Sequence, residues 1–255
     1  MGSYSPKEIL DIWTSNGVKK ANLSIAKMFV LGIMAGVFIG FGSGVFVLAT
    51  SAGGDAFQNM IGKLVGAALF PAGLIMVILC GAELFTGNNL LTLALMDRKI
   101  TVGQMLRNWF IVYAGNLAGS LLIAFLLANT GLFQEAVGER AIAIAASKTS
   151  LTFTQAVLRG IGCNMLVVLA CWMQAGSKEF IGRIFTIWFP IAAFVFLGFE
   201  HSIANMTYIP LGIFLGAEVS WGEFFTANLI PVTIGNMIGG AVIVPCAYYF
   251  AYKKS

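Results

Sequence analysis

Two short polar stretches interrupt long apolar runs, and they hold the residues most able to do chemistry. Residues 80–89 (CGAELFTGNN) place Glu83 between glycines, and residues 198–206 (GFEHSIANM) place Glu200 beside His201, the only histidine of the chain. A carboxylate at membrane depth costs at least about 2.5–3.5 kcal/mol unless it is paired or hydrated. Irregular backbone is tolerated there only inside protein or against a water-filled cavity. Each stretch therefore predicts a break in a helix, serving either function or backbone capping.

The polar residues of the two breaks suit different roles. The hydroxyl of Thr86 can donate a hydrogen bond to a passing anion without adding charge, so Thr86 is assigned to a substrate pathway. An imidazole titrates near neutral pH in water and offers either a neutral N–H or a proton, so His201 is assigned to the same pathway. Glu83 and Glu200 are expected to be structural, capping backbone N–H groups where the helices unwind.

Composition sets the class of protein. The chain has 255 residues, of which 58% are hydrophobic and 10% charged, with a net charge of +4. Soluble domains carry about 25% charged residues, so a water-soluble globule is excluded, as is a nucleic-acid-binding chain. The four cysteines lie in apolar runs without metal-ligand spacing and are expected to be packing residues. An integral membrane protein is predicted, with no metal or cofactor.

Six segments are long and apolar enough to cross a bilayer core, which needs about 20 residues per helix. They are residues 28–49, 61–85, 106–128, 153–175, 184–216 and 225–252. The second and fifth contain the two polar stretches, so these helices are predicted to be broken. Before them, Ser5, Pro6 and Glu8 predict a capped helix over residues 6–18, with an apolar face resting on the membrane surface.

Loop charges predict the orientation. Eleven basic residues lie on one side of the predicted bundle and four on the other. The first group is Lys7, Lys19, Lys20, Lys27, Arg98, Lys99, Arg107, Lys178, Arg183, Lys253 and Lys254, and the second is Lys63, Arg140, Lys148 and Arg159. The positive-inside rule then places both termini, including the segment 1–27, in the cytoplasm of a cell with this protein in its cytoplasmic membrane.

The two halves of the chain resemble each other. Asn108, Gly115, Asn116 and Gly119 recur 120 residues later as Asn228, Gly235, Asn236 and Gly239. Glu83 and Asn88 recur 117 residues later as Glu200 and Asn205, and Thr86 is expected to lie opposite His201. Three spans per half require the repeats, about 28–130 and 150–252, to be inverted. The fold class predicted is a single all-α membrane domain over residues 1–255. Inverted repeats whose equivalent helices are broken are an architecture typical of transport proteins.

The residues around these positions resemble the formate/nitrite transporter family. Four separated motifs carry the resemblance: residues 79–87, 160–167, 199–206 and 228–236. It extends from about residue 5 to 253, although many members have cysteine where Val168 stands. The resemblance implies an aquaporin-like fold of six helices and a homopentamer with one pore per protomer.

The resemblance also assigns roles to individual residues. The family's central threonine and histidine match Thr86 and His201, with Asn205 nearby, and its extracellular lysine matches Lys148 in the loop 131–151. The outer hydrophobic constriction matches Leu84, Val167 and Phe194, and the inner one matches Phe70 and Leu74. Asn88 is assigned, like the two glutamates, to the structure of the helix breaks.

These observations predict passive or proton-coupled transport of a small monovalent anion through the lipid bilayer, without enzymatic activity. A water or glycerol channel would show paired Asn-Pro-Ala motifs at the breaks, and an embedded enzyme would use Glu83, Glu200 and His201 as acid–base groups. Formate, nitrite, hydrosulfide and lactate share one charge. The short loop 218–223 and the Thr-Gly-Asn-Asn of residues 86–89 most resemble the hydrosulfide branch of the family.

Overall fold

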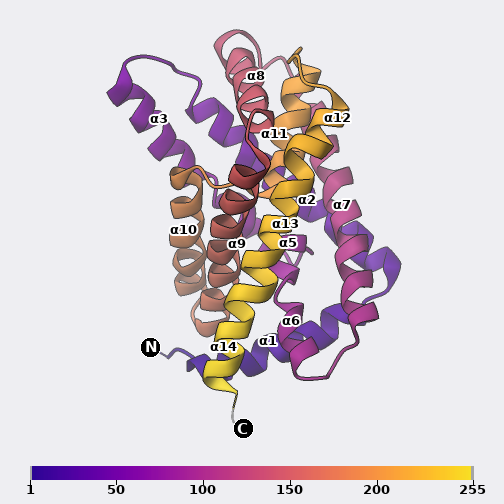
Figure 1. Ribbon diagram of the computed structural model, residues 1–255. Helices are drawn as coiled ribbons and strands as arrows, with labels where there is room; N and C mark the ends of the chain where they lie inside the picture. Colours follow the sequence, from indigo (N-terminus) through magenta and orange to yellow (C-terminus); the bar gives the residue numbers. More distant parts are fainter. Residues whose placement is uncertain (1, 254–255) are drawn as a thin grey trace.

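A computed structural model describes residues 2–253 as a bundle of helices. Six helical stretches are long and apolar enough to cross a membrane: Ile25–Ala49, Ala56–Leu79, Val102–Asn129, Phe153–Gly176, Phe180–Leu197 and Trp221–Tyr252. They coincide with the six segments expected from hydropathy. Figure 1 shows that the two ends of the chain lie at the same end of the bundle, as an even number of spans requires.

The described chain is divided into the following elements. They are α1 (Pro6–Ala21), α2 (Ile25–Ala49), α3 (Ala56–Leu69), α4 (Ala72–Leu79), α5 (Phe85–Asn88), α6 (Leu91–Met96), α7 (Val102–Asn129), α8 (Glu135–Thr149), α9 (Phe153–Gly176), α10 (Phe180–Leu197), α11 (Ser202–Phe214), α12 (Trp221–Glu223), α13 (Ile230–Met237) and α14 (Val244–Tyr252). Two π-helical segments, Phe224–Leu229 and Ile238–Ile243, join the last three helices into one span.

The N-terminal helix α1 begins where its capping signal predicts. The Ser5 hydroxyl accepts from the Glu8 backbone N–H, and the Glu8 carboxylate accepts from the Ser5 N–H, which forms a capping box. The apolar face does not rest on lipid, however. Ile9 and Trp13 are buried against the bundle, and the Trp13 indole N–H donates to the Cys171 carbonyl at 3.2 Å. The helix expected to lie on the membrane surface therefore packs its apolar face against the end of the helix bundle.

The second span is broken as expected. Pro71 separates α3 from α4, and Gly81 takes a left-handed conformation (φ +78°) just after α4 ends. Residues 82–84 then run without regular structure before the short helix α5. A residue with a side chain would be strained at Gly81, so glycine allows the chain to leave the helix at this point.

The fifth span breaks in the same manner. Helix α10 ends at Leu197, Gly198 is left-handed (φ +76°), and α11 begins at Ser202. Gly81 and Gly198 are 117 residues apart and each lies two residues before a glutamate. The two breaks therefore share one backbone design.

Each half of the chain contains a crossing of two helices at glycines, and the two crossings are equivalent. Helix α2 packs on α7 at Gly32 and Gly115, and α9 packs on α13 at Gly160 and Gly235. A methyl group on Gly115 would lie 2.6 Å from the Phe29 carbonyl oxygen, and one on Gly160 would lie 2.7 Å from a carbonyl oxygen of the opposite helix. Close backbone approach at small residues is how membrane helices associate without a hydrophobic driving force.

One element was not expected. The loop 131–151 contains the helix α8, which packs against α11. Figure 1 shows α8 at one end of the bundle and α1 with α6 at the other. Helices α1 and α8 therefore cover opposite ends of the broken spans. Helix α1 contains Lys20 and α8 contains Lys148, and both lysines belong to the candidate site.

Candidate functional site

The two broken spans meet in one polar contact. The Thr86 hydroxyl oxygen lies 2.9 Å from His201 Nε2, and the two residues are 0% and 3% exposed. His201 Nδ1 accepts a hydrogen bond from the backbone N–H of Ala204 at 3.1 Å. A neutral ring therefore carries its proton on Nε2 and donates it to Thr86, which leaves the hydroxyl hydrogen of Thr86 free for another acceptor.

Matching asparagines hold the two breaks in register. Asn116 accepts from the Phe85 N–H at 2.9 Å and donates to the Glu83 carbonyl at 2.9 Å. The second half repeats the pattern, with Asn236 accepting from the Ser202 N–H at 2.9 Å and donating to the Glu200 carbonyl at 3.0 Å. Each asparagine so satisfies backbone groups that the broken helix leaves without partners.

This register corrects one expectation. The anchored pairs place Phe85 opposite Ser202, so Leu84 is the repeat equivalent of His201 and Ile203 is the equivalent of Thr86. Thr86 and His201 do lie opposite each other as expected, but they are not repeat equivalents, because the repeat is offset from that pairing by two positions. They meet because the two breaks face each other, and each fills a position that is apolar in the other half.

Glu200 lies in a buried ion pair at the α8 end. Lys148 Nζ is 3.0 Å from both carboxylate oxygens, and the Lys148 side chain is 15% exposed. Asn205 donates to Glu200 at 2.6 Å, and Asn228 donates to the Lys148 carbonyl at 2.8 Å. The Lys148 ammonium also lies 5.2 Å from the centre of the Tyr208 ring. Lys148 is thus built into the structure at the end of α8 rather than solvated in a loop.

The α1 end repeats this network around Glu83. Lys20 Nζ lies 2.6 Å from Glu83 Oε1, and Asn88 donates to Oε2 at 2.7 Å. Asn108 accepts from Asn88 at 2.9 Å and donates to the Lys20 carbonyl at 3.1 Å. Sequence reasoning missed Lys20 as a site residue. The repeat held the signal, because Lys20 precedes the first span of its half as Lys148 precedes the first span of the other.

A cavity lies on each side of the central contact. The α8 cavity encloses about 80 Å³ and the α1 cavity about 260 Å³. The α8 cavity is lined by Phe46, Phe70, Lys148, Phe194, Val195, Gly198, Phe199, Glu200, His201, Ala204, Asn205 and Tyr208. The α1 cavity is lined by Trp13, Asn16, Lys20, Leu74, Val77, Ile78, Gly81, Ala82, Glu83, Leu84, Gly87, Asn88, Cys171, Gln174 and Arg183.

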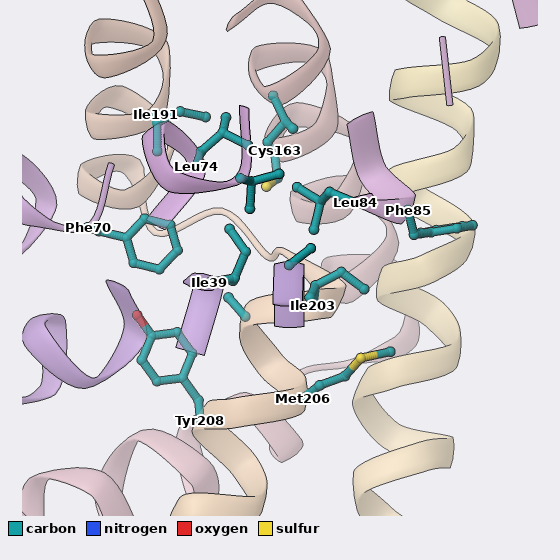
Figure 2. Packing of buried hydrophobic residues seen from close by; sticks show 14 of the residues in the cluster. Ile39, Phe70, Leu74, Leu84, Phe85, Cys163, Ile191, Ile203, Met206 and Tyr208 are labelled. Carbon is teal, nitrogen blue, oxygen red and sulfur yellow. The ribbon is translucent and has the colours of Figure 1, made fainter. Parts of the chain in front are cut away.

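The apolar residues expected to form constrictions are divided between the two cavities. Phe70 and Phe194 both line the α8 cavity, and their rings pack edge to face with centroids 5.7 Å apart. Leu74 and Leu84 both line the α1 cavity. The cavity linings therefore pair Phe70 with Phe194 and Leu74 with Leu84, and the division of these residues into an outer and an inner constriction stays a prediction. Figure 2 shows Phe70, Leu74 and Leu84 in the same packed region, while Phe85 points away from it.

Val167 and the four cysteines differ in where they lie relative to the cavities, and only Cys171 of these five lines one of them. Val167 is 1% exposed and does not line either cavity. Cys163 and Cys171 are buried free thiols, whereas Cys80 is exposed and Cys246 half-buried. Across residues 2–253, no group of three or more His, Cys, Asp or Glu side chains is arranged to hold a metal ion.

The sequence matches the family model described as "Formate/nitrite transporter" over residues 7–250. The chain is 40% identical to the "Probable formate transporter" of Methanothermobacter thermautotrophicus, with all of both chains covered. It is 38% identical to the "Formate channel FocA" of Escherichia coli strain K12, with 98% of this chain and 94% of the relative covered.

Solved structures show the same fold. The structure described as "FNT family ion channel" superposes with a TM-score of 0.87 at 30% identity, covering 96% of this chain and 98% of the other. The structure described as "Pentameric formate channel with formate bound" superposes with a TM-score of 0.80 at 34% identity, covering 90% and 98%. Three of these four relatives are described as formate transporters or channels and none as a hydrosulfide channel, so the hydrosulfide branch stays a prediction.

Proposed function

Because the chain belongs to the formate/nitrite transporter family, we propose that it carries small monovalent anions through a membrane between the α1 and α8 cavities. The observation that carries this proposal is the Thr86–His201 contact at 2.9 Å, which lies where the two broken spans meet. Its relatives are transporters and channels rather than enzymes, so Glu83, Glu200 and His201 are given no acid–base catalysis.

Desolvation is the barrier that such a pathway must lower. Phe70 and Phe194 on one side, and Leu74 and Leu84 on the other, exclude water around a passing ion. Between them, the free hydroxyl hydrogen of Thr86 replaces part of the lost hydration. Since Thr86 carries no charge, the anion is stabilised without being trapped.

The ion pairs support the same conclusion. Glu83 is neutralised by Lys20 at 2.6 Å and Glu200 by Lys148 at 3.0 Å, so each carboxylate is prevented from repelling an approaching anion. Unpaired carboxylates at these depths would be costly in themselves and would close the path to negative charge.

The hydrogen bonds of His201 bear on proton coupling. Nδ1 accepts a hydrogen bond from the Ala204 N–H. In a doubly protonated ring Nδ1 would itself carry a proton, and the Nδ1–H and Ala204 N–H groups would point at each other in this conformation. His201 therefore acts as a hydrogen-bond donor, and an anion that crosses as its neutral acid receives a proton that water in a cavity relays from the bulk solution. Either mode, passive or proton-coupled, uses the same contact.

Assembly and location complete the proposal. The 34% identical structure is described as a pentameric formate channel, which supports a homopentamer with a pore in each protomer. The excess of basic residues supports a place in the cytoplasmic membrane, with α1 and both termini in the cytoplasm. The α1 cavity would then be the cytoplasmic one.

Parallel flux measurements in sealed proteoliposomes test the function and its substrate. Formate, nitrite, hydrosulfide and lactate are offered one at a time to the purified protein. The formate-channel relatives favour formate, whereas residues 86–89 and the short loop 218–223 favour hydrosulfide. Flux of any of these anions above that of empty liposomes supports anion transport. The anion with the fastest flux identifies the preferred substrate and so the branch of the family. Covalent conversion without flux would contradict it.

A further inference from the structure

The two cavities differ in one charge. Lys20 and Lys148 are each paired with a glutamate, so both pairs are neutral overall. The α1 cavity is also lined by Arg183, and the α8 cavity has no comparable residue in its lining. The larger cavity therefore carries a net positive charge that its counterpart lacks.

Arg183 is held in place by a neutral partner. Its Nε and Nη2 atoms donate to the Gln174 side-chain oxygen at 3.1 and 2.9 Å. Gln174 is 8% exposed at the end of α9, so this acceptor is itself fixed. Among residues 2–253, no carboxylate oxygen lies within 4.0 Å of a nitrogen of Arg183. The arginine is immobilised without being neutralised.

The position of Arg183 is unfavourable for a cation on local grounds. It lies in the first turn of α10, where the helix dipole favours negative side chains. The amide of Gln174 holds the guanidinium there but adds no opposite charge. Helix stability alone therefore does not account for a fixed cation at this place.

We propose, on the basis of the transport function above, that Arg183 makes the α1 cavity a loading site for the transported anion, so that the pore binds anions more tightly from this side than from the other. The guanidinium can donate from Nη1 and from the second N–H of Nη2, which Gln174 does not use, and such donors suit a carboxylate or another small oxyanion. Asn16 and Lys20 supply further donors in the same cavity.

The expected size follows from Coulomb's law. At about 8 Å and an effective dielectric of about 40, one unit charge changes the local concentration of a monovalent anion by about fivefold. A passive pathway has equal permeability in both directions when the anion concentration is low. The charge of Arg183 should therefore change the anion concentration at which flux saturates, not the permeability ratio. The concentration that half-saturates flux should be lower from the α1 side than from the α8 side.

The experiment measures half-saturating formate concentrations from each side separately, in proteoliposomes of known protein orientation. Arg183→Gln should raise this concentration about fivefold on the α1 side and change it less than twofold on the α8 side. Arg183→Lys keeps the charge and should stay within twofold of the wild-type protein. Arg98→Gln removes an exposed charge at the same end of the bundle and should not shift either value.

Gln174→Glu separates charge from structure. This variant keeps the acceptor oxygen and the position of Arg183 but converts the contact into an ion pair, so it should reproduce the shift of Arg183→Gln. A Gln174→Glu protein that behaves like the wild type, or an Arg183→Lys protein as impaired as Arg183→Gln, would overturn the proposal in favour of a structural role. If the wild-type protein carried none of formate, nitrite, hydrosulfide and lactate, the proposed function would be overturned, and this proposal with it.

Discussion

The two helix breaks are alike in everything that builds them and different where they meet. Each has a left-handed glycine, a glutamate two residues later, a lysine paired with it, and an asparagine that anchors the backbone. At the centre, Leu84 and Thr86 of the first break stand opposite His201 and Ile203 of the second. The repeated residues therefore form the scaffold, and the unrepeated ones are those that the proposed function places beside the anion.

The cavities show the same division. Both are bounded by a neutral lysine–glutamate pair and by several apolar side chains, among them Phe70 and Phe194 in one cavity and Leu74 and Leu84 in the other. They differ in volume, about 260 Å³ against about 80 Å³, and in the presence of Arg183. Variants of repeated residues should consequently have similar effects in both halves, whereas variants of unrepeated residues should not.

The largest effect is expected for the unrepeated histidine. His201→Phe retains bulk but removes the N–H that orients Thr86. Loss of one hydrogen-bond donor to an oxyanion costs an enzyme about 10²–10³ in rate, and we expect an effect of that order for an anion that passes this contact. Anion uptake into proteoliposomes should fall by about 100-fold or more, with assembly unchanged by size-exclusion chromatography. Leu84→Phe adds an aromatic ring at the equivalent position and should preserve the contact. A fully assembled His201→Phe protein with normal uptake would refute the central role.

The repeated glutamates should matter for stability in both halves. Glu200→Gln leaves Lys148 without its counter-charge, and breaking a buried pair costs about 3 kcal/mol or more. Glu83→Gln should cost less, about 2 kcal/mol, because the Lys20 side chain is 22% exposed against 15% for Lys148. Thermal unfolding in detergent, followed by intrinsic fluorescence, measures the two losses. A larger loss for Glu83→Gln would contradict the comparison.

The glycine crossings should respond equally. Gly115→Ala and Gly160→Ala each push a methyl group to within 2.7 Å of a carbonyl oxygen, and overpacking of this kind costs about 1–3 kcal/mol. Gly103→Ala is the matched control, because the nearest atom to its added methyl group, the Thr101 hydroxyl oxygen, lies 3.9 Å away. The same unfolding assay applies. If only one of the two crossings were sensitive, the halves would not share their packing.

The smallest effect concerns the neutrality of the Lys148–Glu200 pair. Lys148→Gln leaves one negative charge at the α8 cavity, and at about 8 Å with a dielectric of about 40 this should lower anion flux about fivefold. The deficit should shrink as salt is raised, since the Debye length is about 8 Å at 0.15 M. The double variant Lys148→Gln/Glu200→Gln restores neutrality and should recover flux to within about twofold. A double variant as slow as the single one would indicate a structural cause.

Much of the fold could be predicted from local signals. Six apolar runs, the capping box at Ser5 and the glycines at the breaks depend on neighbours close in sequence, and each appears in the structure as expected. The helix α8 and the buried face of α1 were missed. Their side chains are only moderately apolar, so hydropathy alone does not reveal that another part of the chain covers them.

For the candidate site, the sequence singled out some of the residues that meet at the breaks but not their pairing. Thr86, His201 and Asn205 were identified by residue type and by resemblance, whereas Lys20 and Arg183 look like ordinary basic residues of a membrane-flanking segment. Glu200 was expected to cap the backbone, yet its carboxylate binds a lysine 52 residues away. Such pairs join elements distant in sequence, and nothing local to either residue specifies its partner.

The amino-acid sequence was enough to establish the membrane location, the six spans, the two breaks and the repeat, because these follow from hydropathy and backbone preferences along the chain. Only the tertiary structure showed that Leu84, not Thr86, is the equivalent of His201, and that Phe70 belongs with Phe194. It also showed that glutamates neutralise Lys20 and Lys148, whereas Arg183 is held by the uncharged Gln174. The physical reason is that charge compensation and packing depend on distances between helices, which the order of residues in each helix does not contain.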